Sequence, residues 1–98
     1  MGQYYRRDGS QYNNVLDWAK DFEKLDRAVK QETLSNGYRV STVFLVLNHN
    51  FGGGKPLIFE TMVFEGNNFV GLDADRYSTE KEAIEGHKRM VEKWKSKQ

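Results

Sequence analysis

Two apolar runs joined by a glycine-rich stretch constrain the fold of this chain more than any other feature. "YRVSTVFLVLN" (residues 38–48) and "LIFETMVFE" (57–65) are rich in β-branched and aromatic residues, and both alternating sets of positions are largely apolar. This pattern is typical of strands that lie inside a sheet or are covered on both faces. The connecting "NHNFGGGKP" (48–56) therefore predicts a hairpin loop, longer than the usual two to five or so residues.

A helix is predicted before the first of these strands. Asn14 is a good helix cap, and Asp17 suits the positive end of the helix dipole. Apolar side chains then recur at steps of three and four residues, at Val15, Trp18, Phe22, Leu25 and Val29. "SNG" (35–37) supplies a residue that tolerates positive φ. We expect one amphipathic helix that ends at this segment.

A second helix is predicted at the C-terminal end. Thr79 and Glu82 have the spacing of a capping box, although Ser78 is an alternative cap. Acidic residues lead this segment and basic residues end it, as the helix dipole prefers. The predicted inward stripe consists of Ala83, Ile84, His87, Met90, Val91 and Trp94.

These elements predict an α+β fold with the order α-β-β-β-α. The turn signal "GNN" (66–68) precedes a weaker third strand within residues 69–77. Ninety-eight residues suffice for one domain, so we expect a single domain over 14–98, with a three-stranded antiparallel meander between an N-terminal and a C-terminal helix. Residues 1–13 predict an irregular arm, either loose or packed on the domain through its tyrosines.

Composition and charge exclude several classes of protein. The chain has no cysteine, which excludes disulfides and thiolate metal sites. A formal net charge of +1 is not that of a general nucleic-acid binder. No apolar run is long enough to cross a membrane, and "MGQYYRRDGS" lacks the apolar core of a signal peptide. We expect a cytoplasmic protein with no membrane contact and no cofactor.

The glycine-rich loop is open to two interpretations. It is not a phosphate-binding P-loop, because Lys55 is followed by Pro56 and a strand rather than by Ser or Thr and a helix. Three glycines and a lysine can nevertheless form an anion-binding nest. The same residues also fit a purely structural bend, and the sequence does not decide between the two.

Other candidate groups also admit structural explanations. His49 and His87 could join a carboxylate at a metal, but no spacing requires it, and His87 fits a core histidine bonded to a backbone group. Glu60, among apolar neighbours, is either a functional carboxyl or one member of a salt bridge with Arg76 or Lys55. No nucleophile pattern is present, so we predict no catalytic residue and a non-enzymatic protein.

Several blocks of the sequence together resemble a family of short bacteriophage and prophage proteins. These blocks are "NVLDWAKDFEKLDR", "VSTVFLVLNHNFGGGKPLIFETMVFEG" and "DRYSTEKEAIEGHKRMV", and they cover nearly everything from Asn14 to Val91. The resemblance implies a phage or mobile-element protein expressed inside a bacterial cell, and it implies no particular activity. Relatives commonly have Pro where this chain has Lys55, which argues against an indispensable role for that lysine.

Together these observations predict an accessory phage protein that binds and inhibits a host bacterial protein, as in counter-defence or host takeover. The exposed-looking Tyr4, Tyr5 and Tyr12 are residue types common in recognition. An alternative is a small-ligand protein that sequesters or hydrolyses a nucleotide signal, and a second alternative is a minor structural virion protein. We expect a monomer or homodimer. The predicted binding residues are His49, Asn50, Phe51, Gly53, Lys55, Arg76 and Tyr77.

Overall fold

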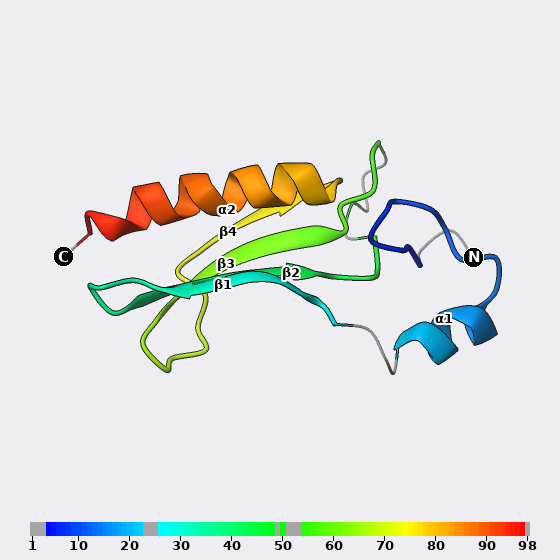
Figure 1. Cartoon of the computed structure of the whole chain (residues 1–98), viewed down its shortest axis with the longest axis horizontal. Coiled ribbons are helices and arrows are strands. Elements are labelled where there is room, and N and C mark those ends of the chain that lie inside the picture. The colour runs from blue at the N-terminus through cyan, green and yellow to red at the C-terminus, as the bar shows by residue number, and fades with distance from the viewer. Residues whose placement is uncertain (1–3, 23–25, 49, 51–53, 98) are drawn as a thin grey trace.

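The structure is an α+β domain in which one long helix lies along one face of a four-stranded antiparallel sheet (Figure 1). This computed structural model describes residues 4–22, 26–48, 50 and 54–97. The strand order is β1-β2-β3-β4. None of the helices in these ranges is long and apolar enough to span a bilayer. The elements are α1 (Val15–Phe22), β1 (Ala28–Thr33), β2 (Tyr38–Phe44), β3 (Phe59–Glu65), β4 (Asp73–Tyr77) and α2 (Glu80–Lys95).

The sheet has four strands, and the prediction of three was wrong. The predicted N-terminal helix ends at Phe22, and residues 28–33 instead pair antiparallel with β2. "SNG" is the turn of this hairpin and not a helix end: Leu34 N–H donates to the Tyr38 carbonyl at 2.7 Å, and Gly37 adopts a φ of +93°. Without β1, the backbone groups along one side of β2 would have no strand partner, so hairpin pairing with β2 overrides the local helical period.

Helix α2 begins at the predicted cap. Glu82 N–H donates to Thr79 Oγ1 at 3.1 Å, and the Thr79 hydroxyl donates to the Glu82 carboxylate at 3.0 Å. The buried side of the helix consists of Ala83, Gly86, His87 and Met90. Ile84 was predicted to face inward but is 38% exposed. It lies one residue off the buried stripe, and a single residue step rotates a helix by about 100°.

The core between α2 and the sheet has two adjoining parts. The part near the start of α2 contains Phe44, Phe59, Tyr77 and Ala83 with Tyr5, Val46 and Ile58. The part farther along the helix contains Val40, Val63 and Met90, against which Tyr38 and Trp94 pack. The strand residues Val40, Phe44, Phe59 and Val63 point to the same side of the sheet, so the strands contribute alternate side chains to the core under α2.

The N-terminal segment is packed on the domain from Tyr4 onward. Tyr5 N–H donates to the Val46 carbonyl at 2.9 Å, and the side chains of Tyr5 and Tyr12 are buried. Of the two alternatives for this segment, packing through the tyrosines is therefore the one observed, and the expected exposure of Tyr5 and Tyr12 was wrong. Val46 has a φ of +73°, which is unusual for a β-branched residue. Regular pairing of β2 ends at Phe44, before the predicted end of the strand, and Val46 turns its carbonyl to the N-terminal segment.

Candidate functional site

The two faces of the sheet are covered very differently. Side chains of Val40, Thr42 and Phe44 point toward α2, so their neighbours in sequence point away from it. In Figure 1, α2 lies on one side of the sheet, and the loop between β3 and β4 lies on the other. We call this second side the open face. Its side chains are Gln31, Thr33, Arg39, Ser41, Val43, Glu60, Met62, Phe64, Ala74 and Arg76.

An arginine and two phenylalanines form the most exposed apolar part of the open face. The Arg39 guanidinium carbon lies 4.6 Å from the centroid of the Phe64 ring and 5.8 Å from that of Phe69. Phe69 is 84% exposed, and the adjacent Val70 is 67% exposed. We call Arg39, Phe64, Phe69 and Val70 the aromatic patch. An exposed phenylalanine beside a stacked arginine has the composition of an interface anchor.

The β3–β4 loop is held against the open face at a glycine. A Cβ added at Gly71 would overlap the Cε atom of Met62, so the glycine lets the loop approach the end of the Met62 side chain closely. Leu72 N–H also donates to the Val63 carbonyl at 2.8 Å. These contacts place Phe69 and Val70 beside the face rather than away from it.

The Glu60 carboxyl belongs to a cross-strand ion pair. Arg76 Nε lies 2.9 Å from Glu60 Oε2, and the two residues are direct partners in the β3–β4 pairing. Glu60 is the more buried member, with 13% of its side chain exposed against 44% for Arg76. Glu60 therefore forms the salt bridge with Arg76 that the sequence suggested. A shallow hollow of about 330 Å³ beside the pair is lined by Glu60, Ala74, Asp75 and Arg76.

The glycine-rich loop is closed by asparagine side chains at its described ends. Asn48 Oδ1 accepts from the backbone N–H groups of Asn50 at 2.8 Å and Leu57 at 3.0 Å. Asn50 Nδ2 donates to the Lys55 carbonyl at 3.0 Å, and the Lys55 side chain is exposed. The predicted binding residues His49, Phe51 and Gly53 lie outside the described residues.

Arg76 and Tyr77 point to opposite faces of the sheet because they are consecutive residues of β4. Arg76 lies on the open face, whereas the Tyr77 ring packs under α2 so closely that a Cβ at Gly86 would overlap it. Burial raises the pKa of Tyr77. Ile58 N–H donates to the Tyr77 carbonyl at 3.0 Å, which brings the end of β4 to the same end of the sheet as the glycine-rich loop. The two predicted residues therefore do not contribute side chains to one surface.

A chain of polar side chains is buried under α2. Thr42 Oγ1 lies 2.5 Å from Thr61 Oγ1 and 2.6 Å from His87 Nδ1, and His87 Nε2 lies 3.0 Å from Glu32 Oε1. A carboxylate only accepts, so His87 Nε2–H donates to Glu32 and Nδ1 accepts from the Thr42 hydroxyl. Thr42 in turn accepts from Thr61. We call these four residues the buried polar chain.

Burial keeps His87 neutral in this chain. It lowers the histidine pKa, and the hydrogen bond and charge of Glu32 oppose that effect without overcoming it. The order hydroxyl, imidazole, carboxylate is also found where a hydroxyl acts as a nucleophile. Here Thr42 has no exposed surface, so a substrate has no access to its hydroxyl in this conformation. His87 was correctly predicted as a core residue, but its partners are side chains rather than a backbone group.

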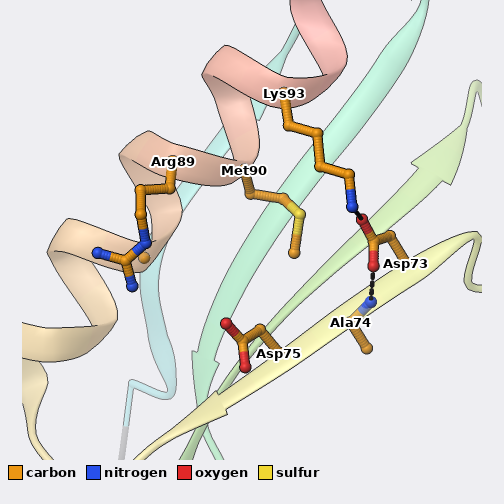
Figure 2. Close-up of a pocket in the computed structure, with 7 residues that line it drawn as sticks. Asp73, Ala74, Asp75, Arg89, Met90 and Lys93 are labelled. Carbon is orange, nitrogen blue, oxygen red and sulfur yellow. Dashed lines mark hydrogen bonds and ion pairs between the residues drawn. The ribbon is translucent and has the colours of Figure 1, made fainter.

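A second hollow, of about 250 Å³, lies between α2 and β4 (Figure 2) and is lined by Asp73, Ala74, Asp75, Gly86, Arg89, Met90 and Lys93. Asp73 Oδ2 accepts from Lys93 Nζ at 2.7 Å and from Trp94 Nε1 at 2.9 Å. These bonds lower the pKa of Asp73. The two acidic side chains of this hollow come from β4 and the two basic ones from α2, so it presents no single sign of charge to a ligand.

Within the described ranges, no cluster of three or more His, Cys, Asp or Glu side chains is placed to hold a metal ion. Comparison with protein-family models, with curated proteins and with solved structures found no match to this chain. Among the described residues, the open face with its aromatic patch is the candidate surface that the geometry favours. The sequence prediction missed Arg39 and Phe69. The available signal was an arginine inside an apolar strand and a turn segment, "NNFVGL" (67–72), that contains three large apolar residues.

Proposed function

We propose that this chain is a non-enzymatic binding protein and that its protein partner docks on the open face, centred on the aromatic patch. The observation that carries the proposal is the 84% exposure of Phe69 beside a sheet face that neither of the two described helices covers. A large exposed aromatic side chain loses apolar contact with water when a partner covers it. Half-buried Met62 and Phe64 extend the apolar area onto the sheet.

The charges of the open face favour a protein over a nucleotide. Arg76, a cation among the predicted binding residues, is paired with Glu60, and Asp75 also lines the same hollow. Two carboxylates beside one guanidinium disfavour a further anion there. Arg39 is instead stacked on aromatic rings, an arrangement common where arginine anchors a protein interface.

The nature of the partner is proposed from the sequence resemblance to bacteriophage proteins. A phage accessory protein acts inside a bacterial cell, so the partner would be a host bacterial protein, and binding would inhibit it. Counter-defence and host takeover are the two settings that fit a small binding protein of this kind. This part of the proposal depends on the resemblance alone.

Affinity capture from bacterial lysate tests the binding surface. The wild type is compared with an Arg39→Ala/Phe69→Ala variant of the aromatic patch. The matched control is Ile84→Ala/Lys88→Ala, which removes one exposed apolar and one exposed basic side chain from the outer side of α2. We expect the wild type and the control to retain the same host protein, identified by mass spectrometry and confirmed with purified components, and the patch variant to lose it.

A third variant, His49→Ala/Lys55→Ala, tests the glycine-rich loop as the competing surface. Loss of the partner with this variant, and not with the patch variant, would move the site from the open face to the loop. Thermal melts of all variants by circular dichroism check that each is folded. Equal retention by every folded variant would contradict both surfaces.

A further inference from the structure

The two edge strands, β1 and β4, differ in whether side chains bond the backbone N–H groups that point away from the sheet. Leu34 N–H donates to the Tyr38 carbonyl, and the register pairs Glu32 with Val40 and Lys30 with Thr42. In an antiparallel ladder, alternate residues direct their N–H and C=O groups to the neighbouring strand and away from it. Positions 30, 32 and 34 therefore face β2, and Gln31 and Thr33 direct their backbone groups to the free edge.

The opposite edge, β4, is blocked by its own side chains. Ala74 N–H donates to Asp73 Oδ1 and Arg76 N–H donates to Asp75 Oδ1, each at 2.9 Å. These two donors would otherwise be offered to an added strand, and charged side chains at an edge are a common means of preventing such pairing. Among the described residues, no side chain covers the outward N–H groups of Gln31 or Thr33 on β1.

We propose that β1 pairs antiparallel with β1 of a second copy of this chain, around a twofold axis at Gln31. Hydrogen bonds can form between the copies only where outward-directed residues of both strands face each other, and these residues are Gln31 and Thr33. The possible pairings therefore differ from one another in steps of two residues. Centring on Gln31 places Lys30 of each copy opposite Glu32 of the other. Centring on Glu32 would place that carboxylate opposite its own copy, and like charges directly opposite are unfavourable. Centring on Thr33 would place Glu32 opposite Leu34 and Lys30 opposite Asn36, so that register forms no ion pair between the copies.

Charge complementarity thus selects one register, and the resulting contact is self-complementary, as a twofold dimer requires. Lys30 already lies 3.2 Å from Glu32 within the chain, so the dimer would gather two lysines and two glutamates into one alternating group. The pairing would form a continuous sheet of eight strands, four from each copy. The twofold axis is perpendicular to that sheet, so both α2 helices lie on one side and both open faces on the other.

Sedimentation equilibrium over a wide range of protein concentration measures the association. We expect a reversible dimer in the wild type, weakened at least tenfold by Gln31→Pro. This change removes an outward N–H and the side-chain bond from Gln31 to Ser41, but it breaks no backbone bond to β2. The matched control is Ala74→Pro, which makes the same change at the outward position of β4 and should leave the dimer intact. A wild type that stays monomeric at all concentrations, or a dimer lost only in the control, would overturn the proposal.

Two further measurements keep the proposal testable if the proline variant fails to fold. Lys30→Glu places like charges opposite each other in the proposed register and should weaken the dimer about tenfold or more. A cysteine at position 31 would face its own copy at a Cα separation of about 5.5 Å, within disulfide range. A cysteine at position 33 would lie about 14 Å from its copy. We expect Gln31→Cys to oxidise to a covalent dimer and Thr33→Cys to remain reduced; the reverse result would reject the register.

Discussion

The covered and open faces of the sheet use alternate residues of the same strands, yet they differ in almost every physical respect. On the covered face, Phe44 and Phe59 are fully buried, and the polar side chains Thr42 and Thr61 satisfy each other and His87. On the open face, the charged side chains Arg39 and Glu60 remain partly exposed and bond to neighbours across the surface. The difference indicates that the covered face supplies stability and leaves the open face available for recognition.

Matched phenylalanine truncations should show the largest contrast between the faces. Phe44→Ala removes a side chain that is 1% exposed and packed on Phe59, and we expect a loss of about 3–5 kcal/mol of unfolding free energy. Phe64→Ala removes a half-buried ring from the open face and should cost about 1 kcal/mol. Urea unfolding of both variants measures the two losses. Equal losses would show that the open face is covered in solution.

Two glycines that each permit a close approach offer the next contrast. A Cβ at Gly86 would overlap the Tyr77 ring, which is held in the core, whereas a Cβ at Gly71 would meet only the flexible end of Met62. We expect Gly86→Ala to destabilise the protein by about 2–3 kcal/mol, despite its better helix propensity. Gly71→Ala should stay within about 0.5 kcal/mol of the wild type. Thermal melts measure both effects, and a stabilised Gly86→Ala variant would contradict the close packing of Gly86 on the Tyr77 ring.

A single substitution can interrupt the buried polar chain while keeping the shape of the side chain that it replaces. Thr42→Val leaves the Nδ1 atom of His87 and the hydroxyl of Thr61 without their partner, and we expect a loss of about 1–2 kcal/mol. The control is Ser41→Ala, the next residue on the open face, which should cost under about 1 kcal/mol. If Thr42→Val proves neutral or stabilising by chemical denaturation, the chain of hydrogen bonds does not stabilise α2 on the sheet.

Acid should destabilise the protein through the same buried polar chain. We expect this effect to be smaller than those of the three sets of substitutions above. The folded-state pKa of His87 lies below the unfolded value of 6.5 because burial disfavours the charged ring. A lowered pKa means that the unfolded chain binds the proton more tightly. Stability from this group is therefore complete above about pH 6.5 and declines as the pH falls, by at most about 1.4 kcal/mol per unit.

Glu32 extends this loss to lower pH. Its pKa is lowered, because burial acts to raise it but the hydrogen bonds from Lys30 and His87 outweigh that effect. Its contribution is present above the unfolded value of 4.5 and declines below it. Melting temperatures from pH 7 to 4 should fall less steeply for His87→Gln than for the wild type. Parallel curves for the two proteins would mean that His87 does not titrate with unfolding.

Short-range sequence patterns correctly predicted the helices and strands that are determined by residues close together in the chain. The capping pair Thr79 and Glu82 marks the start of α2, and the two apolar runs mark β2 and β3. The candidate surface was much less predictable. Arg39 and Phe69 are thirty residues apart in sequence, and the loop that brings them together depends on the approach of Gly71 to Met62. Nothing in the spacing of these four residues reports that contact.

The sequence by itself determined the β2–β3 hairpin and helix α2, because alternation, turn residues and caps act over short distances. Only the tertiary structure decided that residues 28–33 are a strand, since the edge of β2 required a partner that local periodicity did not indicate. It also decided the burial of Tyr5 and the choice of which apolar face α2 covers. Those outcomes depend on the apolar area and backbone pairing gained between separate segments of the chain, and both quantities exist only once the chain has folded.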